Sequence, residues 1–292
     1  MSAITEAVAW SGGLARPRVS VPEGATDCHF HVYDGRCPAA PGTALQHPDA
    51  GPEDYRALQR RLGTTRGVLV QPSTYGTDNR LHLDALQALG ADHLRMVAVV
   101  APDVAEAEIR RLHEAGVRGV RFNLTQPGPL APDDLGTMAR RIAGFAWHCQ
   151  LNKRPEQLVE AEPMLRRLPC RIVFDHLARI LDPRGLDAGA FAAIRRLLDQ
   201  GRAWVKLSGA YITSREGPPG YADAGAVASA LAAAAPGRML WGSDWPHPTQ
   251  SADRKPDDAA LLDLLAEWVP ANEARRRMLG DNPAELYGFQ SG

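Results

Sequence analysis

The sequence lacks a charge excess and a long apolar run, and each absence excludes a class of protein. Lys and Arg number 33 and Asp and Glu number 34 in 292 residues, so the formal net charge is −1. This balance argues against a nucleic-acid-binding protein, because such proteins usually carry a basic excess on one face. No stretch approaches the ~18 apolar residues that a membrane span requires, so we expect no membrane partner.

Cysteine is also scarce, with only Cys28, Cys37, Cys149 and Cys170 present. These residues show neither CxxC spacing nor the density of a disulfide scaffold. The N-terminal segment has no basic start followed by an apolar core, so it does not resemble a secretory signal. We therefore expect buried free thiols and a cytoplasmic location.

What is present is typical of a folded globular chain, with 45% hydrophobic and 23% charged residues. Short apolar runs rich in β-branched residues alternate with alanine- and leucine-rich segments of helical spacing, such as 52–62, 101–116 and 187–201. A last helical stretch is expected around 257–279. The predicted strands are 26–32, 66–71, 94–100, 117–124, 146–151, 171–176, 202–209 and 238–244.

Eight strands that alternate with helices predict a single α/β domain, a closed (β/α)8 TIM barrel. A doubly wound sheet is the alternative, but it would usually show a GxGxxG turn after the first strand. The segment there reads HVYDGRCP, and no repeat or linker divides the chain. We expect an N-terminal lead over 1–24 and the barrel over 25–292.

The active site of such a barrel lies at the carboxyl ends of its strands. The first predicted strand ends in His29 and His31, which strand alternation places on one face. Two neighbouring imidazoles suit either a metal ion or the polarisation of a carbonyl oxygen. The eighth run ends at Asp244, a potential metal ligand or general base, with a helix N-cap as the alternative.

The sixth run ends in FDHLAR, and its alternation has two consequences. His176 is expected on the same face as Phe174, and Asp175 is expected to face the helices or the surface. Alone, His176 would more often be structural than catalytic. Three strand ends that carry His, His and Asp together favour a reaction centre.

The motifs DCHFHV, VQPSTYGTDNR, GVRGVRFNL, FDHLAR, KLSG and LWGSDWPHP together resemble the amidohydrolase superfamily. They are most similar to the amidohydrolase-2 branch, which contains 2-pyrone-4,6-dicarboxylate lactonase and related lactone hydrolases and isomerases. The resemblance extends from about residue 25 to 288, and the motif order matches a (β/α)8 barrel. It implies a catalytic set of His29, His31, His176 and Asp244.

Metal-dependent members of the superfamily often place a metal-binding histidine at the end of strand five. Here that strand reads WHCQLN, which offers Gln150 and Asn152, while His148 lies early in the strand and is expected in the core. The fourth strand ends with Arg121 and Asn123 and has no bridging Lys or Glu, so a two-metal centre is not expected. A single weak Zn²⁺ on His29, His31 and Asp244 stays open, but the resemblance implies that no cofactor is required.

The resemblance also implies a mechanism and a substrate. Asp244 would take a proton from the water that attacks a lactone carbonyl, while the three histidines stabilise the charge that develops on the carbonyl oxygen. Arg121 resembles a family arginine that holds a substrate carboxylate, and Arg179 could make a similar contact. Further substrate-binding candidates are Ser73, Tyr75 and Asn123.

The chain departs from the dicarboxylate lactonases, which have additional arginines after strands four and seven. The segments NLTQPG and SGAYITS contain none, and Lys206 in strand seven is equally consistent with a strand residue whose amine reaches solvent. We therefore expect a small-molecule lactone with one carboxylate, either sugar-acid or muconolactone-like. A lactone isomerase, a mononuclear metal-dependent hydrolase or decarboxylase, and a barrel that binds a small acid without chemistry are the alternatives. The sequence does not indicate an oligomeric state.

Overall fold

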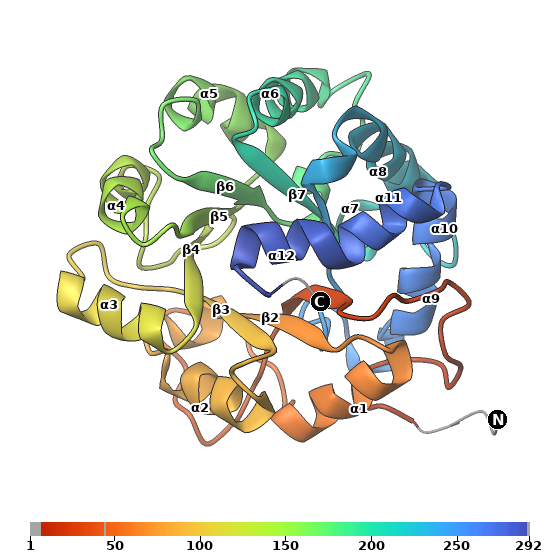
Figure 1. Cartoon of the computed structure of the whole chain (residues 1–292), viewed down its shortest axis with the longest axis horizontal. Helices are drawn as coiled ribbons and strands as arrows, with labels where there is room; N and C mark the ends of the chain where they lie inside the picture. Colours follow the sequence, from red (N-terminus) through yellow and green to blue (C-terminus); the bar gives the residue numbers. More distant parts are fainter. Residues whose placement is uncertain (1–6, 44, 291–292) are drawn as a thin grey trace.

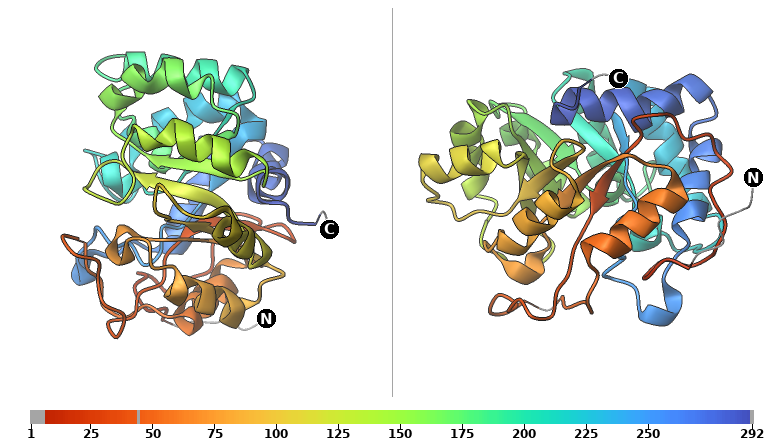
Figure 2. Two further views of the ribbon diagram at one scale, coloured as in Figure 1. Left: turned by 90° about the vertical axis from the view of Figure 1, so that its left-hand side faces the viewer. Right: turned by 60° about the horizontal axis from the view of Figure 1, so that its bottom comes forward.

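Eight parallel strands form one sheet in the computed structural model, which describes residues 7–43 and 45–290 (Figure 1). Each strand pairs with the next one along the chain, and the helices lie outside the strands in both views of Figure 2. This arrangement confirms the predicted (β/α)8 TIM barrel, while residues 1–6 of the predicted lead lie outside the described residues. The strands are β1 (Thr26–Phe30), β2 (Arg66–Val70), β3 (Leu94–Ala98), β4 (Val117–Asn123), β5 (His148–Asn152), β6 (Arg171–Phe174), β7 (Ala203–Leu207) and β8 (Met239–Trp241).

The helices that surround the barrel follow the apolar spacing of the sequence. In α1, Tyr55, Leu58 and Leu62 are buried, and the ring of Tyr55 stacks on Phe30 with 3.5 Å between ring centroids. Gly63 ends this helix in the left-handed conformation, at φ 82°. The helices are α1 (Pro52–Leu62), α2 (Arg80–Leu89), α3 (Glu106–Glu114), α4 (Asp134–Ala143), α5 (Pro155–Leu165), α6 (Ala188–Asp199), α7 (Ala210–Thr213), α8 (Ala222–Ala234), α9 (Asp258–Asp263), α10 (Leu265–Trp268), α11 (Asn272–Arg276) and α12 (Asn282–Tyr287).

The barrel closes where β1 meets the segment that follows β8. The Asp244 N–H donates to the His29 carbonyl at 2.8 Å, and the His31 N–H donates to the Trp245 carbonyl at 2.8 Å. Both hydrogen bonds join residues at the carboxyl ends of the two strands. Closure of the barrel therefore brings the first and eighth strand ends, and their polar side chains, together.

The opposite end of the barrel is filled by the C-terminal segment. Leu286, Tyr287 and Phe289 pack in one apolar cluster with strand residues that include Val68 and Val173. Figure 1 shows α12 lying across this end of the barrel. Apart from His148, whose ring lies 5.4 Å from that of Tyr287, the interior is therefore apolar at its amino end, and most of its polar groups gather at the other end.

Two predicted elements differ from the structure. The eighth strand is short, because Gly242, Ser243 and Asp244 leave the sheet and Asp244 adopts a left-handed φ of 63°. The helical stretch expected around 257–279 is present, but it is divided into α9, α10, α11 and a π-helical turn that begins at Arg277. Pro270 contributes to the break after α10, since it disfavours a helical conformation in the residue before it.

No helix within residues 7–43 or 45–290 combines the length and the apolar content needed to cross a bilayer.

Candidate active site

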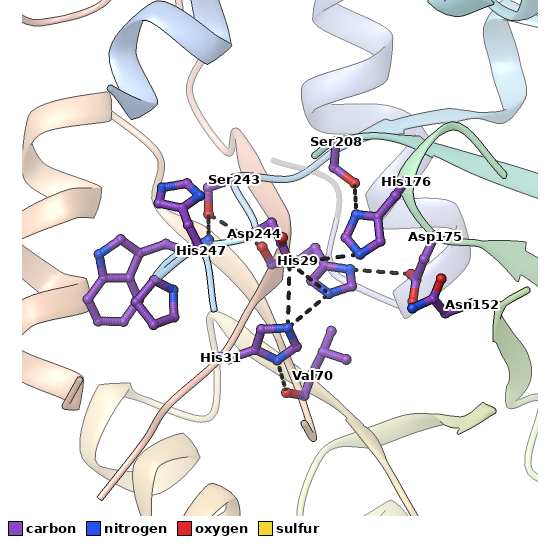
Figure 3. Close-up of polar contacts among 12 residues, drawn as sticks. His29, His31, Val70, Asn152, Asp175, His176, Ser208, Ser243, Asp244 and His247 are labelled. Atoms are coloured by element: carbon purple, nitrogen blue, oxygen red, sulfur yellow. Dashed lines mark hydrogen bonds and ion pairs between the residues drawn. The ribbon is translucent and has the colours of Figure 1, made fainter. Parts of the chain in front are cut away.

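Three histidine rings converge on one carboxylate oxygen at the carboxyl end of the barrel (Figure 3). The Nε2 atoms of His29 and His31 each lie 3.5 Å from Oδ1 of Asp244, and Nε2 of His176 lies 3.8 Å from it. The two Nε2 atoms of His29 and His31 are 3.3 Å apart. The structure thus brings together the four residues that the sequence indicated as a catalytic set.

The opposite ring nitrogen of each histidine is held by a different partner. Nδ1 of His31 lies 2.7 Å from the Val70 carbonyl oxygen, and Nδ1 of His176 lies 3.1 Å from the Ser208 hydroxyl. A carbonyl oxygen only accepts, so Nδ1 of His31 carries a hydrogen. The Ser208 hydroxyl can donate to His176 and leave a hydrogen on Nε2.

Burial and neighbouring charge set the protonation of this group. Burial lowers the pKa of His29 well below its usual value, with Lys206 acting in the same direction, and burial also lowers the pKa of His176. Burial alone would raise the pKa of Asp244, but the adjacent His176, His31 and His29 hold it below its ordinary value. At neutral pH the site therefore presents an ionised carboxylate beside neutral His29 and His176.

Asp175 does not face the helices or the surface, so that expectation is wrong. Its side chain is fully buried, with Oδ1 lying 3.3 Å from Nδ1 of His29 and Oδ2 lying 3.5 Å from Nε of Arg121. The alternation ends after Asp175, because His176 through Arg179 all have left-handed φ values between 50° and 57°. This turn redirects the chain, so that Asp175 and His176 both reach the reaction centre.

Lys206 is also buried in the site, with its amine away from solvent. Its Nζ donates to Oε1 of Gln150 at 2.8 Å and lies 3.2 Å from Nδ1 of His29 and 3.5 Å from Oδ1 of Asp175. Nδ1 of His29 therefore lies between a donor, the Lys206 amine, and an acceptor, the Asp175 carboxylate. The burial of His148 agrees with the expected core position, and burial lowers its pKa to about 3.

A cavity of about 380 Å³ opens above Asp244. His31 and His176 line it, whereas His29 is fully buried and is not among the lining residues. Three of the predicted substrate-binding residues, Arg121, Asn123 and Arg179, line the same cavity. Further uncharged polar lining residues are Thr125, Gln126, Asn152, Tyr211, Thr249 and Gln250.

The remaining predicted binding residues lie behind this wall. Ser73 accepts a hydrogen bond from Asn123 at 2.7 Å, and it is not among the lining residues. Tyr75 lies farther away, and its hydroxyl accepts from the Asp34 N–H at 2.9 Å. Neither residue reaches the cavity directly, although Ser73 can orient the amide of Asn123.

The side chains of His29, His31 and Asp244 form a group that could hold a single zinc ion. His29 Nε2, His31 Nε2 and Asp244 Oδ1 lie 3.3–3.5 Å from one another. Tetrahedral ligands at the usual zinc distances lie about 3.3 Å apart, so these atoms fit one ion without rearrangement. The backbone carbonyl behind His31 also matches the partner that a metal-bound histidine usually has. A second group, made of His29, Asp175 and His176, is less suitable, because the Lys206 ammonium contacts it.

Three polar residues at this end of the barrel were not found from the sequence. Tyr211 in α7 places its hydroxyl 2.7 Å from Oδ2 of Asp244 and 2.9 Å from Nδ1 of His247. Nε2 of His247 lies 3.1 Å from Oδ2 of Asp258 at the start of α9. The signals available were the Tyr in SGAYITS and the His in LWGSDWPHP, but neither residue ends a strand.

The chain is similar to known proteins over the region that carries these site residues. A family model described as amidohydrolase matches residues 26–289. The chain is 34% identical over 290 residues to a 2-pyrone-4,6-dicarboxylate hydrolase of Comamonas testosteroni, covering 95% of this chain and 94% of that protein. It is 36% identical over 279 residues to a 4-sulfomuconolactone hydrolase of Rhizobium radiobacter, covering 92% and 91%. It is 32% identical over 274 residues to a D-galactarolactone isomerase of Agrobacterium fabrum, covering 93% of each.

The matched region spans every strand of the barrel and includes His29, His31, His176 and Asp244. The predicted resemblance is therefore confirmed, and the chain belongs to the amidohydrolase family.

Proposed function

We propose that this protein is a hydrolase that opens a small carboxylated lactone. The observation that carries the proposal is the ionised Asp244 carboxylate, which lines the cavity and is surrounded by three imidazoles, with two arginines in the same cavity. The three relatives named above all act on lactones by their names, and two of them are hydrolases. A base, polarising groups and cations for a carboxylate are the parts that this reaction needs.

Asp244 is the general base of the proposed reaction. Its low pKa keeps it ionised at neutral pH, and it lines the cavity where water and substrate meet. It accepts a proton from water as the water oxygen attacks the lactone carbonyl carbon. The tetrahedral intermediate then collapses, the bond to the ring oxygen breaks, and the proton on Asp244 passes to that oxygen.

The histidines divide into two roles. His176 and His31 both line the cavity; His176 polarises the carbonyl oxygen through its Nε2–H, and a well-placed donor of this kind contributes roughly 3–4 kcal/mol to the transition state. His29 is fully buried, so in this proposal it orients Asp244 from below and does not touch the substrate. Arg121 and Arg179 bind the substrate carboxylate.

A mononuclear metal-dependent reaction is the second candidate, and the ligand spacing described above favours it. His29, His31 and Asp244 would hold one Zn²⁺, which would polarise the carbonyl and make bound water more acidic. In that case Arg121, Arg179 and His176 keep the same roles toward the substrate. A lactone isomerase is a third candidate, supported by the galactarolactone relative.

The test is turnover of a panel of lactones by the purified protein, with and without a chelator and added Zn²⁺. The panel contains a pyrone dicarboxylate, a muconolactone and several sugar-acid lactones. Asp244→Asn should lower kcat about 10²–10⁴-fold, because it removes the base without changing the side-chain size. Asp253→Asn is the matched control, since this exposed residue lies beyond the cavity wall on the loop after β8.

Each outcome separates the candidates. Incorporation of oxygen from labelled water into an open-chain acid supports hydrolysis, and a rearranged lactone without label supports isomerisation. Loss of turnover with chelator and recovery with Zn²⁺ supports the metal-dependent reaction. Full activity of Asp244→Asn on every accepted lactone would exclude the proposed base.

A further inference from the structure

We propose that Tyr211 is a positioning residue that fixes the Asp244 carboxylate, and that a buried His247–Asp258 pair fixes Tyr211. The proposal rests on the function proposed above. Asp244 has two oxygens with different surroundings: Oδ1 faces the three histidines, and Oδ2 accepts a hydrogen bond from the Tyr211 hydroxyl at 2.7 Å. The hydroxyl donates to this carboxylate oxygen and therefore selects one rotation of the group.

Behind Tyr211, two ionisable side chains are removed from solvent. His247 and Asp258 are both 0% exposed, and their contact of 3.1 Å joins the loop after β8 to the first residue of α9. A 2.9 Å contact between Nδ1 of His247 and the Tyr211 hydroxyl extends this series of contacts to α7. Three segments distant in sequence therefore connect to the Asp244 carboxylate, and we call the three linked side chains the Tyr211–His247–Asp258 chain.

The backbone conformation around Asp244 supports a functional role for this arrangement. Asp244 and His247 have φ values of 63° and 56°, in the left-handed region that residues other than glycine rarely adopt. The His247 N–H donates to the Asp244 carbonyl at 2.7 Å and closes a tight turn between them. Strained residues of this kind persist where surrounding contacts hold them, and they cluster at active sites.

The chemical consequence lies in the direction of the base. A carboxylate held only at Oδ1 can rotate about its terminal bond and turn its lone pairs away from the water. Misplacement by ~1 Å can cost about 10²-fold in rate. The Tyr211–His247–Asp258 chain therefore supports kcat by maintaining the orientation of Asp244, and the substrate carboxylate is bound elsewhere, at Arg121 and Arg179.

The decisive experiment is a double-mutant cycle on kcat with Tyr211→Phe and Asp258→Asn. We expect Tyr211→Phe to lower kcat about 10–100-fold, with KM changed less than about threefold. Asp258→Asn keeps the size of the side chain and should lower kcat about 3–10-fold. Because Asp258 acts through Tyr211, it should have less than about a twofold effect in the Tyr211→Phe background. Independent, multiplicative effects, or a change confined to KM, would overturn the proposal.

A control variant, a stability measurement and a further mutation complete the experiment. Tyr221→Phe is the matched control, because Tyr221 lies near Tyr211 on a second cavity and should leave kcat unchanged. Thermal unfolding of all variants identifies a folding defect, and His247→Gln provides a second way to interrupt the chain.

A crystal structure of Tyr211→Phe tests the positioning role of Tyr211 without a measurement of turnover. Rotation of the Asp244 carboxylate, or its disorder, supports the positioning role, and an unchanged carboxylate contradicts it. If the wild-type protein opens no lactone, the proposed function fails while this structural result still tests the role of Tyr211.

Discussion

At the scale of single residues, the two cavity arginines are not equivalent. Arg121 already has an acidic neighbour, with Asp175 Oδ2 at 3.5 Å, and donates to the Gln71 carbonyl at 3.1 Å. Arg179 donates to Oδ1 of Asn152 at 3.4 Å, and no carboxylate lies within ion-pair distance of it among residues 7–43 and 45–290. The charge of Arg179 is therefore the one most available to an incoming anion.

We expect Arg179→Met to weaken substrate binding more than it slows the chemical step. Loss of a charge-assisted hydrogen bond is worth about 1.5–3 kcal/mol, which corresponds to a roughly 10–100-fold rise in KM. The measurement is steady-state kinetics on a lactone that the protein accepts and on the methyl ester of its carboxylate. Arg154→Met is the control, because Arg154 is exposed and pairs with Glu156. An equal loss on the charged and the esterified substrate would contradict the role.

At the scale of elements, β1 and the segment after β8 pack closely against each other at the site. A Cβ placed on Gly242 would lie 2.6 Å from Cβ and 2.9 Å from the backbone N of His29. Only glycine allows this approach, and the close contact lets the two strand ends exchange hydrogen bonds. The position of His29 against Asp244 therefore depends on a residue that carries no side chain.

Gly242→Ala should separate the two strand ends. Overpacking of this kind lowers the free energy of unfolding by about 1–3 kcal/mol. The displacement of His29 should also lower kcat in the same variant. Urea unfolding and turnover can be measured on the same preparation. Gly128→Ala is the control, because an added Cβ there meets nothing within 4 Å. Unchanged stability and activity of Gly242→Ala would show that the contact between the two strand ends can relax.

Secondary-structure elements also show where the sequence-based prediction succeeded and where it failed. The alternation of strands placed His29 and His31 on one face and identified Asp244 at a strand end, and the structure brings all three together. The same rule failed at Asp175, because the four left-handed residues after it are not encoded by glycine and cannot be anticipated from spacing. His247 was missed for a similar reason, since a tight turn and not a strand carries it to Tyr211.

At the scale of the whole molecule, several histidines are buried without charge. Burial lowers the pKa of His82 to about 3, and the pKa of His148 also to about 3, against an ordinary value of 6.5. At pH values between about 3 and 6.5, each of these rings binds a proton in the unfolded chain but not in the folded chain. The unfolded state therefore binds more protons, and the free energy of unfolding falls as the pH falls through this window.

Each of these histidines should contribute a slope of about 1.4 kcal/mol per pH unit between roughly pH 6 and 4. His148→Gln should remove about one such contribution, whatever its effect on stability at pH 7. The measurement is urea unfolding at a series of pH values. His93→Gln is the control, because His93 is exposed. An unchanged slope in His148→Gln would mean that this ring takes up its proton in the folded state.

The buried charges around His29 have one more consequence. Asp175 and Lys206 have fully buried side chains, and those of Arg121 and Asp244 are only 6% and 3% exposed. Dissolved ions screen charges that they can surround, over a Debye length of ~8 Å at physiological ionic strength, and they have little access to these groups. The charges of the reaction centre are thus screened less than surface charges, and we expect salt to act mainly on the capture of the anion at the half-buried Arg179.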